Sequence, residues 1–158
     1  MDRETENKPE AQNYAKAEML IRKPAKEVFE AIINPDITTN FWFTKASGRL
    51  DANKEVEWVW EMYNHRVPVF VKSIQLPEKI IIDWGNDGEL TTVEWTFKNI
   101  HDNETFLSIV HSGFTGGQDK LIAQVRDSTE GFTIVLAGLK AWLEFGIRLN
   151  LVADRFPQ

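Results

Sequence analysis

The chain has 158 residues, of which 42% are hydrophobic and 27% are charged, and its formal net charge is −6. This length and balance suit one globular domain with a sizeable core. The negative charge argues against nucleic acid as a partner, and no apolar run is long enough for membrane insertion. The chain has no cysteine, which excludes thiol and disulfide chemistry, and we expect a cytoplasmic protein.

The start of the chain predicts a tail followed by a strand. Residues 1–12 alternate in charge and contain no apolar run, so we expect a flexible N-terminal tail there and a single domain over residues 13–158. Residues 14–22 alternate between apolar and polar side chains, which is typical of a half-buried strand.

Two short helices are predicted next. Residues 25–34 place apolar side chains at helical spacing, and Asn34 and Pro35 end that helix. Residues 36–43 predict a second short helix with an aromatic end. The last part of it, Asn40 to Phe43, can either plug the core or form a lid over the mouth of a cavity.

From residue 45 onward the apolar residues recur at every second position. Turn signals separate these segments at roughly the 8–12-residue spacing typical of an antiparallel meander. The clearest strand is EVEWVWEMY, residues 55–63, in which Trp58 and Trp60 share the inward face. Its glutamates, which we expect to form a solvated outer face, are Glu55, Glu57 and Glu61.

A long C-terminal helix is predicted after a hinge at Gly116 and Gly117. Asp127 and Glu130 have the spacing of a capping box, and the helical pattern then runs to about Leu151. The three glycines of this helix each cost about 1 kcal/mol relative to alanine. They leave space for either close indole packing or a ligand, and they are Gly131, Gly138 and Gly146.

An antiparallel sheet with one apolar face needs a cover, and the long helix is the only large element available. The sequence therefore predicts an α+β fold. A curved antiparallel sheet of about six to seven strands wraps around a long C-terminal helix, and two short helices follow the first strand.

This order and several phrases resemble the helix-grip fold of the START/Bet v 1-like superfamily. The nearer resemblance is to the family of the activator of Hsp90 ATPase, in its small, single-domain bacterial form. The phrases that carry it are KPAKEVFEAIINPDITTNFW, TTVEWTF, TFLSIVHSGF and GFTIVLAGLKAWLEFG. The resemblance implies a cavity between helix and sheet that holds a lipid, polyketide or other apolar ligand. It also implies a possible weak chaperone contact, although the chain has no room for the co-chaperone's additional N-terminal domain.

The tryptophans are the first candidates for such a cavity. Strand parity turns Trp58, Trp60, Trp84 and Trp95 toward the helix. These indoles can fill the core by packing, or they can line a cavity for a planar ligand, because each combines a flat apolar face with one N–H donor.

His111 is the sharpest polar candidate because parity places it on the apolar face. It can contact a ligand, act as a general base, or donate a hydrogen bond to a backbone carbonyl near the strand end. No histidine pair has metal-ligand spacing, and no two acids share the inward face. We therefore expect no metal site, no cofactor and no catalytic constellation.

The sequence thus favours a protein that binds a small hydrophobic, planar or aromatic ligand between sheet and helix. One alternative is a polyketide cyclase-like or hydrolase-like enzyme on the same cavity, with His111 as its only candidate. The other is a chaperone-associated module with an exposed apolar patch around Phe41 and Phe43. Oligomeric state is not predicted. The expected ligand-binding residues are Trp42, Trp58, Trp60, Trp84, Trp95, Phe97, His111, Phe132, Val135 and Leu139.

Overall fold

The computed structural model describes residues 13–157, so the predicted N-terminal tail lies outside the described residues. The elements follow in the order β1 (Ala15–Ile21), α2 (Ala25–Ile33), α3 (Pro35–Thr38), β2 (Lys45–Ala46), β3 (Glu55–Trp60), the 3-10 helix η1 (Glu61–Tyr63), β4 (His65–Gln75), β5 (Lys79–Trp84), β6 (Thr91–His101), β7 (Glu104–Ser112), α4 (Gln118–Phe145) and α5 (Leu151–Arg155).

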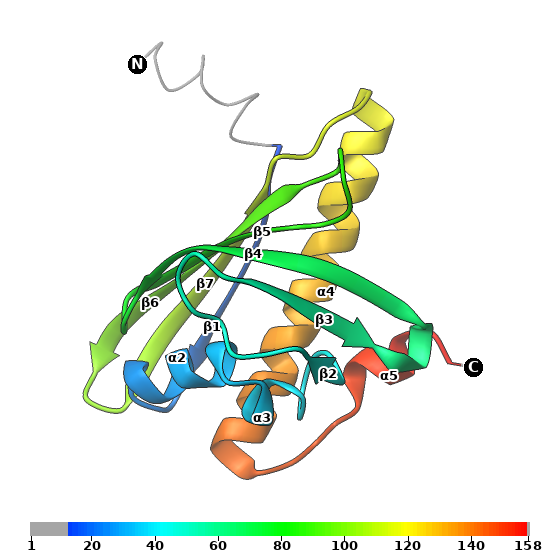
Figure 1. The fold of residues 1–158 in the computed structure, drawn as a ribbon. Coiled ribbons are helices and arrows are strands. Elements are labelled where there is room, and N and C mark those ends of the chain that lie inside the picture. Colours follow the sequence, from blue (N-terminus) through cyan, green and yellow to red (C-terminus); the bar gives the residue numbers. More distant parts are fainter. Residues whose placement is uncertain (1–12, 158) are drawn as a thin grey trace.

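The strands form one seven-stranded sheet in the order β1-β7-β6-β5-β4-β3-β2, and all neighbours pair antiparallel. Figure 1 shows this sheet curving around α4, with α2 and α3 near one end of the helix and α5 near the tip of the β3–β4 hairpin. The predicted α+β fold and its strand number are confirmed.

Period-two alternation explains which sheet face is buried. On β6, Val93, Trp95 and Phe97 are buried, and Leu107 and Ile109 continue the same face on β7. Antiparallel pairing sets Trp95 opposite Ile109 and Phe97 opposite Leu107, so side chains of one face meet across the strands. This face forms the core beneath α4.

Helix α4 begins and ends at positions that differ from the prediction. It starts at Gln118, after Gly117 as N-cap, so the capping box at Asp127 is wrong and Asp127 lies well inside the helix. It ends at Phe145, because Gly146 adopts a left-handed conformation with φ of 66°. The prediction that one helix runs to about Leu151 is therefore also wrong.

Two polar contacts join the C-terminal half of α4 to the end of β1. The Lys140 ammonium donates to the Leu20 carbonyl at 2.7 Å and pairs with Glu144 at the same distance. The Glu144 carboxylate in turn accepts from the Arg22 backbone N–H at 2.8 Å. These contacts hold this half of the helix beside the sheet edge.

Strand β3 is shorter than predicted. It stops at Trp60, and Glu61 to Tyr63 form a single 3-10 turn that Asn64 closes with a left-handed φ of 49°. Glu55, Glu57 and Glu61 are all exposed, although Glu61 belongs to the turn rather than to the strand face. This turn places Tyr63 opposite α5.

After α4 the chain returns to the sheet as α5. The Tyr63 hydroxyl donates to the Val152 carbonyl and lies 3.1 Å from the Ala153 carbonyl oxygen. A further hydrogen bond joins the Arg148 guanidinium to the Asn40 side chain. Within residues 13–157, none of the helices has the length and apolar character to cross a membrane.

Candidate ligand-binding pocket

Trp42 lies at the centre of the aromatic interior and is only 6% exposed. The centroid of its ring lies 4.8 Å from that of Trp58 and 5.9 Å from that of Trp84. Trp95 and Trp60 follow at 6.1 and 6.2 Å. One indole from the loop after α3 therefore contacts four indoles of the sheet, which makes this region a packed aromatic cluster.

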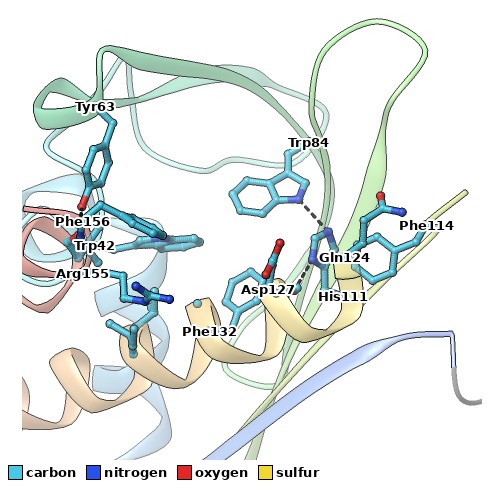
Figure 2. A pocket seen from close by; sticks show the side chains of 15 residues that line it. Trp42, Tyr63, Trp84, His111, Phe114, Gln124, Asp127, Phe132, Arg155 and Phe156 are labelled. Carbon is cyan, nitrogen blue, oxygen red and sulfur yellow. Dashed lines mark hydrogen bonds between the residues drawn. The ribbon is translucent and has the colours of Figure 1, made fainter. Parts of the chain in front are cut away.

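A cavity of about 440 Å³ lies at one side of this cluster, between the middle of α4, the ends of β5 and β7, and α5. Figure 2 shows its aromatic side chains arranged around it, with the Asp127 carboxylate projecting toward it from α4. The lining side chains are mostly apolar, as in sites for small hydrophobic ligands. They belong to Trp42, Tyr63, Trp84, His111, Phe114, Gln124, Asp127, Ser128, Gly131, Phe132, Ile134, Val135, Val152, Arg155 and Phe156.

The structure divides the ten predicted ligand-binding residues into two groups. Five line the cavity: Trp42, Trp84, His111, Phe132 and Val135. Five lie in the buried core outside this lining: Trp58, Trp60, Trp95, Phe97 and Leu139. Strand parity identifies the inward face, but it does not say where along that face the packing ends and a cavity begins.

His111 is buried at the cavity wall. Its hydrogen-bond partners are side chains, not the backbone carbonyl that was one of the three expectations for this residue. The Trp84 indole N–H donates to His111 Nε2 at 3.2 Å, and the Thr91 hydroxyl lies 2.7 Å from the same nitrogen. On the other side of the ring, Nδ1 lies 2.7 Å from the Ser128 hydroxyl oxygen. Both ring nitrogens therefore have partners (Figure 2).

These partners define the tautomer of His111. An indole N–H can only donate, so His111 Nε2 must be the acceptor nitrogen of a neutral ring. The proton then lies on Nδ1 and is donated to Ser128. Burial supports the neutral form of the ring, because it lowers the pKa of His111 from 6.5 to about 4.

This tautomer does not suit a reaction in which His111 activates Ser128, and a general-base role of His111 toward a ligand stays a prediction. A base that activates the Ser128 hydroxyl would need a free lone pair on Nδ1, where His111 carries its proton. Across residues 13–157, no carboxylate forms a hydrogen bond with His111, and no group of three or more His, Asp or Glu side chains could hold a metal ion.

The wall opposite His111 is formed by α5. Arg155 pairs with Glu130 of α4, and this hydrogen bond holds the pKa of Glu130 below its ordinary value. The Arg155 guanidinium also lies 4.4 Å from the centroid of the Phe156 ring, within the range of a cation–π contact. The ring of Tyr63 meets Phe156 edge-on at 6.1 Å.

Ten residues of the lining are not among the predicted ligand-binding residues, although the sequence leaves Gly131 open as space for a ligand. Four of them continue the stripe of Phe132 and Val135 toward the N-terminus of α4 at steps of three and four. Of these four, only Gln124 lies before the predicted helix start. The α5 residues and Tyr63 reach the site only through tertiary contacts, so no local pattern marks them. The missed residues are Tyr63, Phe114, Gln124, Asp127, Ser128, Gly131, Ile134, Val152, Arg155 and Phe156.

The helix glycines differ in what surrounds them. A Cβ at Gly138 would lie 3.2 Å from Phe41 Cβ and 3.3 Å from the Phe41 carbonyl oxygen. A Cβ at Gly131, which lines the cavity, would meet no heavy atom within 4 Å. Gly146 ends the helix in a left-handed conformation. Of the three, Gly131 alone combines open space beside its Cα with a place in the cavity lining.

The second short helix is shorter than predicted, because α3 ends at Thr38, and the aromatic residues expected at its end lie in the following loop and fill the core. Phe41 is 8% exposed and Phe43 is 1% exposed, and the Phe43 ring stacks on Trp58 at 4.7 Å. An exposed apolar patch around these two residues, expected for a chaperone-associated module, is therefore absent, and that expectation is wrong.

Similar folds occur in solved structures with low sequence identity. Protein SSP2350 from Staphylococcus saprophyticus has a TM-score of 0.74 and 22% identity, over 86% of this chain and 95% of its own. The Aha1 dimer from Colwellia psychrerythraea has a TM-score of 0.73 and 14% identity, over 84% and 97%. The predicted Bet v 1-like helix-grip fold is confirmed.

A third similar structure is DynU16, from the dynemicin biosynthetic locus. Its TM-score is 0.76 at 16% identity, and the match covers 86% of this chain but spans about half, 49%, of DynU16. No curated protein matches the sequence. The family of activator of Hsp90 ATPase homolog 1-like proteins matches residues 22–144. The chain therefore belongs to this family, as the phrases of its sequence predicted.

Proposed function

We propose that this protein binds a small, hydrophobic, planar or aromatic ligand in the cavity between α4, α5 and the sheet. The observation that carries the proposal is the cavity itself, about 440 Å³ with a largely apolar lining. The rings of Trp42, Trp84 and Phe132 bound it, and flat rings contact a flat ligand over a large area.

The driving force is the removal of apolar surface from water, at about 25 cal/mol per Å². A few polar groups then orient the ligand. Ser128, Gln124 and Asp127 supply these groups from one face of α4. The similar structures agree with a ligand-binding or related function, since DynU16 comes from a biosynthetic locus. A cytoplasmic location is part of the proposal.

The test is a titration with N-phenyl-1-naphthylamine, an apolar dye that accepts energy from tryptophan. We expect saturable loss of tryptophan emission with one dye bound per chain, because Trp42 and Trp84 lie at the cavity wall. Trp84→Phe should reduce the loss of emission, whereas Trp142→Phe, outside the lining, should change it less. A titration without saturation would contradict the proposal.

A chaperone contact is a second candidate, and one surface feature favours it. Phe145, Ile147 and Leu149, at the end of α4 and beyond it, are 69%, 51% and 44% exposed. Contiguous exposed apolar side chains often mark protein interaction sites. A pull-down with an Hsp90 homologue, compared between the wild type and a triple serine variant at these positions, tests it. Equal recovery from both would reject this surface.

A further inference from the structure

We propose that the ligand of this cavity is an uncharged, flat molecule with a carbonyl oxygen, bound by the hydroxyl of Ser128. The inference rests on the proposed function and specifies the chemical class of the ligand. It follows from the direction of the hydrogen bonds around His111 and from the charges that line the same cavity.

The direction of these bonds starts at Trp84. Its indole N–H donates to His111 Nε2, so the proton of the neutral imidazole lies on Nδ1. His111 Nδ1 therefore donates to the Ser128 oxygen at 2.7 Å. Ser128 acts as acceptor in this bond, and its own O–H proton points away from His111.

The Ser128 proton is available to a ligand. Within residues 13–157, no hydrogen bond is found in which the Ser128 hydroxyl donates to another group, although the side chain lines the cavity and is only half exposed. A ligand oxygen with a lone pair would accept this proton and extend the series of hydrogen bonds that runs from Trp84 through His111 to Ser128. A ligand that brought only a hydrogen-bond donor to this place would leave the Ser128 proton without an acceptor.

The charges of the lining favour an uncharged acceptor over a carboxylate. Asp127 precedes Ser128, and its carboxylate projects toward the cavity (Figure 2). The cation of the lining, Arg155, is already paired with Glu130. An anionic ligand would therefore meet Asp127 without a free partner, whereas a ketone oxygen carries no net charge. The surrounding rings of Trp42 and Phe132 suit a flat carbon skeleton.

Three matched probes test the inference: fluorene, 9-fluorenone and fluorene-9-carboxylate. Equilibrium dialysis at pH 7 measures each dissociation constant. We expect 9-fluorenone to bind about three- to tenfold more tightly than fluorene, as one neutral hydrogen bond provides. The carboxylate should bind more weakly than the ketone.

Two variants identify the donor. Ser128→Ala should remove the preference for 9-fluorenone over fluorene, while Thr133→Ala, an exposed hydroxyl of the same helix, should retain it. The carbonyl stretching band of bound 9-fluorenone gives a direct readout. It should lie at lower wavenumber in the wild type than in Ser128→Ala.

The outcomes separate the two proposals. If fluorene and 9-fluorenone bind with equal affinity, or if Ser128→Ala keeps the preference and the band position, the carbonyl inference is overturned while ligand binding stands. Preference for the carboxylate would also overturn it. If none of the three probes binds and N-phenyl-1-naphthylamine does not bind either, both proposals fail.

Discussion

Two glycines seven residues apart on α4 separate a filled half of the interior from a hollow one. Gly138 lies against the backbone and Cβ of Phe41, so the loop after α3 occupies the space beside it. Gly131 faces open space at the cavity. One stripe of α4 thus packs closely against Phe41 at Gly138 and borders the cavity two turns earlier, at Gly131.

The polar groups differ between the two halves in the same way. In the filled half, Trp95 Nε1 is buried without a hydrogen-bond partner among the described residues. At the hollow half, His111 has partners on both ring nitrogens, and Ser128 still has a proton to donate. The filled half therefore serves stability, and the hollow half has the features of a binding site.

The largest expected effect is the loss of stability when a side chain of the filled half is truncated. Trp58→Ala should lower the free energy of unfolding by about 3–5 kcal/mol, because Trp58 is 1% exposed and contacts Trp42 and Phe43. Phe114→Ala, at the cavity wall, should cost clearly less, since that side chain is only partly buried. Chemical denaturation measures both values, and equal losses would contradict the division.

Titration of His111 gives the next effect. Its pKa is about 4 in the folded protein and near 6.5 when unfolded, so the folded state favours the neutral ring. The contribution of the neutral His111 ring to the free energy of unfolding is fully present above pH 6.5 and is lost as the pH falls toward 4. The loss reaches roughly 3 kcal/mol at 1.36 kcal/mol per pKa unit.

The pH dependence of unfolding should therefore flatten between pH 6.5 and 4 in His111→Gln relative to the wild type. His65→Gln is the matched control, because His65 is exposed at the start of β4. It should keep the wild-type dependence. A His111→Gln profile parallel to the wild type would show that burial of this ring does not shift its protonation.

Leucine at each glycine sharpens the comparison. Gly138→Leu should destabilise the protein by about 1–3 kcal/mol, because its side chain would collide with Phe41. Gly131→Leu should leave stability unchanged or raise it by about 0.5–1 kcal/mol through helix propensity, while its side chain takes up part of the cavity. Thermal unfolding of both variants measures these changes. A lower unfolding temperature for Gly131→Leu would show that the space beside Gly131 is occupied, against this account.

The smallest effect concerns the α5 wall. Tyr63→Phe removes the hydroxyl that bonds to the Val152 and Ala153 carbonyls, and should cost about 1 kcal/mol. Amide hydrogen exchange should accelerate in residues 151–155 more than in the C-terminal half of α4. Uniform acceleration in both segments would mean that α5 does not open separately.

Much of the fold follows from local patterns, whereas ten of the fifteen residues that line the cavity were not predicted to bind a ligand. Period-two runs and the long helical stripe identify the sheet face and its cover, including the inward position of Trp95 and His111. The predicted start of α4 is wrong because Asp127 and Glu130 have the spacing of a capping box but lie inside the helix. Both side chains instead serve the cavity wall, one lining it and one pairing with Arg155.

The position of Trp42 could not be predicted either, since it depends on how the loop after α3 folds back between sheet and helix. That single side chain fills the space among four indoles, and it decides where packing ends. The contribution of α5 depends likewise on contacts with Tyr63 and Glu130, which are distant in sequence.

Binding of N-phenyl-1-naphthylamine to the wild type and to Gly131→Leu tests the central claim most directly. The account predicts saturable binding of one dye per chain in the wild type. Gly131→Leu should lose that binding while its unfolding temperature stays the same or rises. Absence of saturable binding to the wild type, or equal binding to a folded Gly131→Leu variant, would contradict the account.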